Sequence, residues 1–137
     1  MSLNSIFNIA GSAMTAQSVR LNTVASNLAN ADTVSSSVGE TYKARSPVFS
    51  AVLADQFNQQ GAASVKVAGI VESDAPPQME YNPGHPMAND KGYIFRPNIN
   101  VMESMANMIS ASRSYETNVE VFNTAKQLMQ QTIQMGR

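Results

Sequence analysis

The chain of 137 residues contains no cysteine, no tryptophan and a single histidine. Without cysteine it can form neither disulfides nor thiolate metal sites, and one imidazole alone does not make a zinc site of the usual kind. Charge is also scarce, with nine basic and ten acidic residues and a formal net charge of −1. Because no basic patch is available for a phosphate backbone, the composition argues against nucleic acid as a partner.

Motifs that carry catalysis are missing as well. The acidic residues of the central region are dispersed, without calcium-loop or paired-carboxylate spacing, and no Gly-x-Ser-x-Gly or phosphate-binding glycine loop occurs. His85 lies between prolines in Asn82-Pro83-Gly84-His85-Pro86, where a turn residue is a better interpretation than a ligand or base. We therefore predict no enzyme activity, no cofactor, no metal and no small-molecule substrate.

No long hydrophobic run is present either. The first charged side chain is Arg20, and polar residues interrupt the stretch before it, so neither a secretory signal peptide nor a membrane span is expected. The chain is predicted to be cytoplasmic or to be exported by another route.

What the sequence does contain is heptad periodicity at both ends. From Leu3 to Ala31, apolar or small residues form two sets, namely Phe7, Met14, Leu21 and Leu28, and Leu3, Ala10, Val24 and Ala31, with Gln17 as the polar exception. From Val101 to Met135, one seam holds Val101, Met105, Met108, Tyr115, Val119, Phe122, Met129 and Ile133, and Val121, Leu128 and Met135 lie on another face. Each segment predicts a helix, the second about 50 Å long, so the molecule should be elongated.

The middle of the chain holds all six prolines and predicts a small β-rich insert. Strands are expected at residues 65–71 and 92–95, and exposed, mobile loops at residues 35–37 and 59–64. We predict a mainly α fold with a small β-rich insert, in which the N- and C-terminal helices pack as a coiled-coil-like pair. The expected parts are residues 1–33 (helical), 34–98 (loop and β) and 99–137 (long helix).

Two helical motifs leave alternatives open. The segment 22–33 is rich in asparagine, which is typical of a frayed helix end, or else its amides hydrogen-bond neighbouring chains without the desolvation cost of charge. In the segment 110–126, Tyr115 and Phe122 are interpreted as core residues within the chain, and the spacing of Arg113 and Glu116 allows a weak ion pair.

These motifs together resemble those of the flagellar rod, hook and hook-associated axial proteins. The N-terminal signature of that family is similar to Ala25-Ser26-Asn27-Leu28-Ala29-Asn30-Ala31-Asp32-Thr33, and further similarities occur at residues 81–86, 92–93, 97–101 and 115–119. Residues 34–39 depart from the family, because they lack the proline or paired glycines that often follow the signature.

The resemblance implies a structural subunit of the proximal rod of the flagellar basal body. It implies export through the flagellar type III apparatus without a cleaved signal peptide, assembly in the periplasm, and a shaft that transmits torque and forms part of the export channel. The expected partners are other rod proteins, further copies of the chain, and components of the basal-body rings and the export gate. A helical adaptor or export chaperone is the alternative, although it would not need a proline-rich insert.

Subunit contacts are predicted along both helices. The expected interaction residues are Phe7, Met14, Leu21, Asn22, Val24, Asn27, Leu28, Asn30, Met105, Tyr115, Asn118, Val119, Phe122, Met129 and Ile133.

Overall fold

The structure is a computed structural model that describes residues 3–53 and 63–136. In chain order it contains α1 (Leu3–Asn30), β1 (Arg45–Leu53), β2 (Ala63–Glu72), β3 (Gln78–Tyr81), β4 (Tyr93–Arg96) and α2 (Val101–Met135). The predicted mainly α chain with a small β insert is therefore confirmed. Both helices lie where the periodicity predicted them, and α1 ends one residue earlier than expected.

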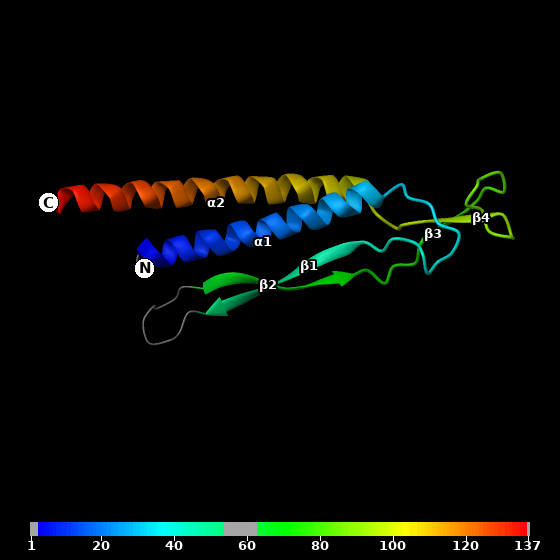
Figure 1. Ribbon diagram of the computed structural model, residues 1–137, viewed down its shortest axis with the longest axis horizontal. Helices are drawn as coiled ribbons and strands as arrows, with labels where there is room; N and C mark the ends of the chain where they lie inside the picture. Colours follow the sequence, from blue (N-terminus) through cyan, green and yellow to red (C-terminus); the bar gives the residue numbers. More distant parts are fainter. Residues whose placement is uncertain (1–2, 54–62, 137) are drawn as a thin grey trace.

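The molecule is elongated, and its two helices run antiparallel (Figure 1). Helix α1 lies between α2 on one side and the β1–β2 hairpin on the other, and it contacts all three elements. The short β3–β4 sheet lies at the end opposite the two chain termini. Because α1 is the layer shared by the helix pair and the hairpin, its side chains determine how both are held.

Small side chains, rather than large ones, form the centre of the helix pair. Ala10 and Ala16 of α1 and Ala111 and Ala125 of α2 are all buried. Within the predicted α2 seam, the large residues Met105, Tyr115, Met129 and Ile133 are exposed in this chain. Met108, Val119 and Phe122 of the same seam are half-buried, so only part of the predicted seam lies in the helix contact, beside the buried alanines.

The axial offset between the helices is set by an aromatic contact near the chain termini. Phe7 and Phe122 meet edge to face, with ring centroids 4.9 Å apart. From this contact α1 continues only to Leu3, whereas α2 continues to Met135. Residues 127–135 therefore extend about 13 Å beyond α1 at a rise of about 1.5 Å per residue.

The start of α2 follows from a polar cap. The Asn100 Oδ1 accepts hydrogen bonds from the backbone N–H groups of Met102 at 3.1 Å and Glu103 at 3.2 Å. These bonds satisfy two of the backbone donors that a helix leaves free at its N-terminus. The acidic side chain of Glu103 in the first turn also suits the positive end of the helix dipole.

The hairpin is antiparallel, with Arg45 opposite Glu72 and Leu53 opposite Ala63. The strand predicted at residues 65–71 is confirmed within β2, but β1 was missed because it contains Pro47. A two-stranded sheet tolerates that proline, since each strand has an edge on which no backbone donor is needed. The loop predicted at residues 59–64 is wrong for Ala63 and Ser64, which begin β2, and residues 59–62 lie outside the described part.

The β3–β4 sheet pairs Gln78 with Arg96 and Tyr81 with Tyr93. It confirms the strand predicted at residues 92–95, shifted by one residue, whereas β3 was not predicted. The mobile loop expected at residues 35–37 is wrong for Ser35, which is buried, forms a β-bridge with Phe95 and lies 2.6 Å from the Thr41 hydroxyl. Ile94, which is fully buried, provides the apolar centre of this end.

Candidate interaction site

The predicted interaction residues divide into two groups by their burial in the single chain. An inner group is buried or half-buried within the chain, namely Phe7, Met14, Leu21, Val24, Asn27, Leu28, Asn30, Asn118, Val119 and Phe122. Those directed to solvent are Asn22, Met105, Tyr115, Met129 and Ile133. The inner group packs within the chain. The outer group is more exposed, and among its large apolar members the exposed fraction runs from 38% at Tyr115 to 60% at Ile133.

The interpretation of Phe122 as a core residue is supported by its contact with Phe7, whereas Tyr115 has 38% of its surface exposed. Arg113 and Glu116 form no ion pair in the described part of the chain, where the two salt bridges are Arg45–Glu72 and Arg96–Glu80. The charged side chains of Arg113 and Glu116 are therefore solvated in the isolated chain.

Large apolar side chains are exposed along the whole length of α2, on more than one face of the helix. They include Met102, Met105, Ile109, Tyr115, Val121, Leu128, Met129, Ile133 and Met135, and the last two have 60% and 80% of their surface exposed. Near the chain termini, Ile6 of α1 and Val121 and Leu128 of α2 line an open apolar groove. An exposed apolar groove of this kind is a candidate interaction site.

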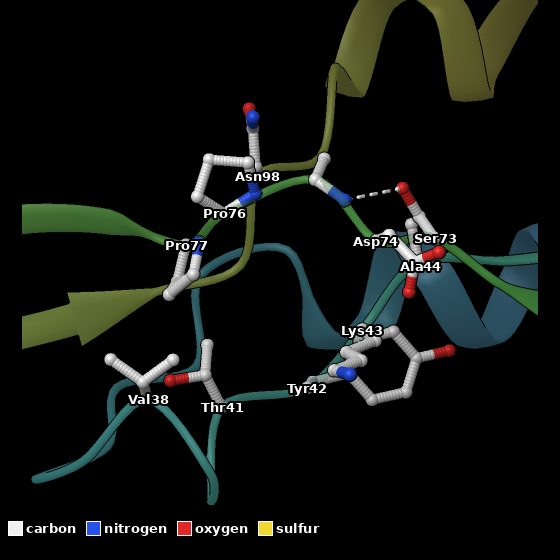
Figure 2. A pocket seen from close by; sticks show the side chains of 11 residues that line it. Val38, Thr41, Tyr42, Lys43, Ala44, Ser73, Asp74, Pro76, Pro77 and Asn98 are labelled. Atoms are coloured by element: carbon white, nitrogen blue, oxygen red, sulfur yellow. Dashed lines mark hydrogen bonds between the residues drawn. The ribbon is translucent and has the colours of Figure 1, made fainter.

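The pockets lined by the described residues contain no group of side chains arranged for catalysis. One pocket of about 180 Å³ lies between the loop at residues 38–44, the segment 73–77 and Asn98 (Figure 2). Its charged side chains are Lys43 and Asp74, and the Ser73 Oγ accepts a 3.2 Å hydrogen bond from the Ala75 N–H. No cluster of three or more metal-binding side chains occurs among the described residues, and none of their helices is apolar enough over a sufficient length to span a bilayer.

His85 lies in the predicted turn, which is confirmed by its hydrogen bonds. Its backbone N–H donates to the Asn82 carbonyl at 3.1 Å, and its own carbonyl accepts from Ala88 at 2.9 Å. The imidazole Nδ1 accepts a 3.1 Å hydrogen bond from the Met87 N–H. The imidazole therefore stabilises the backbone of its own turn.

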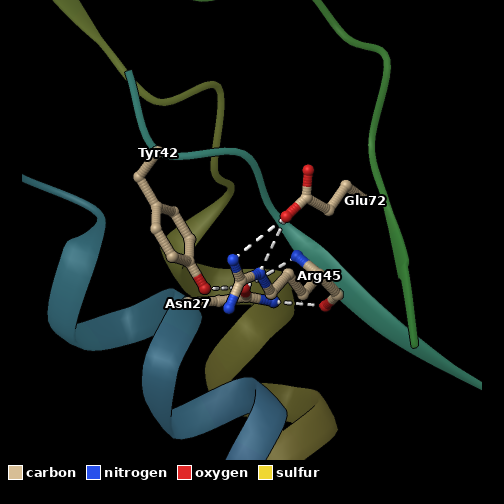
Figure 3. Close-up of polar contacts among 4 residues, drawn as sticks. All are labelled: Asn27, Tyr42, Arg45 and Glu72. Atoms are coloured by element: carbon tan, nitrogen blue, oxygen red, sulfur yellow. Dashed lines mark hydrogen bonds and ion pairs between the residues drawn. The ribbon is translucent and has the colours of Figure 1, made fainter. Parts of the chain in front are cut away.

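Asn27, in the asparagine-rich segment, has a role that neither sequence interpretation considered. Its side-chain Nδ2 donates to the Arg45 carbonyl at 2.7 Å, and its Oδ1 accepts from the Arg45 N–H at 2.9 Å (Figure 3). The Tyr42 hydroxyl donates to the same Oδ1 at 2.9 Å. The amide therefore makes three hydrogen bonds within the chain, and two of them join α1 to the first residue of β1.

The other two asparagines of that segment lie differently. Asn30 turns its Nδ2 back to the Ser26 carbonyl at 2.8 Å within its own helix. Asn22 is exposed on α1. Of the three amides that were predicted together, the fold therefore directs only that of Asn22 to solvent.

Several residues that position this site were missed. Tyr42 and Arg45 hold Asn27 from a segment outside the periodic helices, and Ala111 and Ala125 hold α2 against α1. The spacing of Ala111 and Ala125, two heptads apart, was a detectable signal. No local signal links Asn27 to Arg45, because their contact depends on the tertiary fold.

Two protein families match the ends of the chain. The family described as flagella basal body rod protein matches residues 7–34, which cover most of α1. The family described as flagellar basal body rod FlgEFG protein C-terminal matches residues 90–135, which include all of α2. Both matches fall on the helices that carry the predicted interaction residues.

Curated relatives extend the similarity to the whole chain. The flagellar basal-body rod protein FlgC of Escherichia coli O6:H1 is 51% identical, and that of Salmonella typhimurium strain LT2 is 48% identical, with 100% of both chains covered in each case. The FlgC protein of Bacillus subtilis strain 168 is 35% identical over 95% of both chains. The chain therefore belongs to the FlgC family of flagellar basal-body rod proteins, as a structural subunit of the rod.

Proposed function

We propose that the chain polymerises with further copies of itself and with other rod proteins to form the proximal rod. The assembled rod is a periplasmic shaft that transmits motor torque and forms part of the export channel. The chain has no catalytic role, takes no small-molecule substrate and binds no nucleic acid. It reaches the periplasm through the flagellar type III apparatus, and it meets basal-body ring and export-gate components there.

The exposed apolar surface of α2 carries this proposal. Met102, Ile109, Ile133 and Met135 each have more than half of their surface exposed, although the chain already has a helix partner and a hairpin. Burial of apolar surface stabilises an interface by about 25 cal/mol for each Å² removed from water. Repeated in every subunit, such contacts favour an extended assembly over a monomer.

Within the proposal, the predicted interaction residues have two roles. The inner group holds α1 against α2 and against the hairpin, with the two helices packed as a coiled-coil-like pair, and the outer group, including Met105, Tyr115, Met129 and Ile133, contacts neighbouring subunits. Residues 1–33, 34–98 and 99–137 remain our proposed division of the chain. In this division the two end segments form the inner layer of the rod, and the middle segment lies outside it.

Negative-stain electron microscopy of concentrated protein, alone and with other rod proteins, tests the proposal. Tubes or short rods are the expected result. A helical adaptor or export chaperone, the alternative function, predicts discrete complexes and no filaments under any of these conditions. Monodisperse particles in every mixture, with normal swimming by a strain that lacks the chain, would overturn the proposal.

A further inference from the structure

The β1–β2 hairpin is attached to α1 by side-chain hydrogen bonds at two widely separated points. At its base, the Arg45 N–H donates to the Asn27 Oδ1 at 2.9 Å. Further along, the Val65 N–H donates to the Ser12 Oγ at 3.1 Å. In both cases a backbone donor of the hairpin is satisfied by a side chain of the helix, which takes the place of a third strand.

The spacing of these two attachments matches between helix and strand. Ser12 and Asn27 are separated by a rise of about 22 Å along α1, at about 1.5 Å per residue. Val65 is paired with Ala51, which lies about 20 Å from Arg45 along β1 at about 3.3 Å per residue. The hairpin therefore lies nearly parallel to α1, and both attachments form only in this orientation.

The two attachments differ greatly in strength. The Asn27 side chain makes three hydrogen bonds and is only 8% exposed, and the Arg45 guanidinium pairs with Glu72 at 3.0 Å across the hairpin base. The base is extended by one more bond, from the Ser73 N–H to the Ala44 carbonyl at 2.7 Å. The Ser12 attachment is a single, exposed hydrogen bond. Solvent competes with an exposed bond, so the far attachment is the weaker one.

The hairpin exposes large apolar side chains on both of its faces. Val48, Leu53, Ile70 and Val71 are all exposed, and Leu53 has 74% of its surface exposed. In the described part of the chain, the hairpin contacts α1 and no other helix. Movement away from α1 at the Ser12 end would expose Ala63, Ser64 and Val67, which are half-buried there, and would break one side-chain hydrogen bond, while Asn27 keeps the base in place.

We propose that the β1–β2 hairpin is an arm that pivots at Asn27 and is held against α1 by a releasable latch at Ser12. Asn27 is the positioning residue of this arm. The pivot and the latch belong to the single chain.

Hydrogen exchange measured by NMR on the full chain tests the arm, because each attachment is reported by one backbone amide. Arg45 reports the pivot, and Val65 reports the latch. In the unmodified chain, Val65 should exchange at least about tenfold faster than Arg45. Ser12→Ala should accelerate Val65 alone, whereas Asn27→Ala should accelerate both amides. The amides of Ala16 and Ala111 in the helix pair show whether each variant remains folded.

A second variant keeps the test decisive if Asn27→Ala does not fold. Tyr42→Phe removes only the hydroxyl that donates to Asn27 Oδ1, and it should accelerate Arg45 by about three- to tenfold, as expected for one lost hydrogen bond. Equal acceleration of Arg45 and Val65 in Ser12→Ala would mean that the hairpin opens as a unit, which overturns the proposal. Rapid exchange of both amides in the unmodified chain overturns it as well. None of these outcomes depends on rod assembly.

Discussion

Arg20 and Asn107 join the two long helices through a hydrogen bond of 2.8 Å, from the guanidinium Nη2 to the amide Oδ1. Arg20 is the only charged residue of α1, and its partner on α2 is a neutral side chain. Together with the Phe7–Phe122 contact, this bond sets the antiparallel register of the pair. The helices are thus aligned by one polar contact and one aromatic contact, with alanines between them.

Changes at Asn107 test how far this bond stabilises the helix pair. Asn107→Ala should lower the free energy of unfolding by about 1.5–3 kcal/mol, because hydrogen bonds to charged groups are stronger than neutral ones. Asn107→Asp supplies a carboxylate to Arg20 and should unfold at least as late as the unmodified chain. Urea denaturation followed by circular dichroism measures both. Equal midpoints for all three proteins would show that the bond contributes nothing.

At Gly92, both the backbone conformation and the close packing around the residue require glycine. Its φ of +80° disfavours other residues, and an added Cβ would lie 2.9 Å from the Tyr81 ring and 3.1 Å from Pro83. Gly92→Ala should therefore destabilise the β3–β4 end by about 1–3 kcal/mol. Gly39→Ala is the matched control, since nothing lies within 4 Å of its added Cβ. Similar exchange rates of the Ile94 amide in both variants would contradict this account.

Gln17 places a side-chain oxygen in the packed region of α1 without a hydrogen-bond partner in the described structure. An unsatisfied buried acceptor costs about 1–3 kcal/mol, and methionine fills a similar volume without that cost. Gln17→Met should raise the free energy of unfolding by about 1 kcal/mol. Gln127→Met, at an exposed position of α2, should change it little. A loss of stability in Gln17→Met would show that this oxygen has a partner in solution.

Ile133 tests the proposed assembly surface, because it is exposed in the single chain and contributes little to its fold. Ile133→Asp should change the stability of the isolated chain by less than about 0.5 kcal/mol. In the rod it would bury an unpaired carboxylate in every subunit, so assembly and swimming should be lost. Gln134→Asp adds the same charge at the neighbouring exposed position and should retain motility. Normal swimming by Ile133→Asp would remove this face from the interface.

His85→Ala tests the interpretation of the single histidine as a turn residue. The substitution removes the Nδ1 acceptor of the Met87 N–H but leaves the prolines that flank the turn. Stability should fall by no more than about 1 kcal/mol, and assembly should be close to normal. A motility assay and metal analysis of the purified protein check this. Stoichiometric metal, or a non-motile variant, would refute the turn interpretation.

The helices were predictable because their signals are local and repeated. Proline is confined to residues 47–97, and the apolar periodicity continues up to Met135, so α2 was located to the residue. Strand β1 was not predictable in the same way. Pro47 argues against a strand, and almost all of its positions are exposed, so no alternation of buried and exposed residues marks it.

The buried alanines of α2 were missed because heptad analysis favours large apolar residues. Ala111 and Ala125 carry little hydrophobic signal, yet they are the buried residues of this helix. The link from Asn27 to Arg45 spans 18 positions and exists only once the hairpin has folded back on α1. Contacts of this kind depend on tertiary structure, which no single-sequence pattern encodes.

The unequal ends of the helix pair have a mechanical consequence for a rod made of such subunits. Because residues 127–135 of α2 extend past α1, the subunit has a projecting apolar flank at the end where the two termini lie. In the proposed rod, subunits that cover this flank would overlap side by side instead of meeting at flat end faces. A twisting load on such a rod would be carried as shear along the length of each overlap.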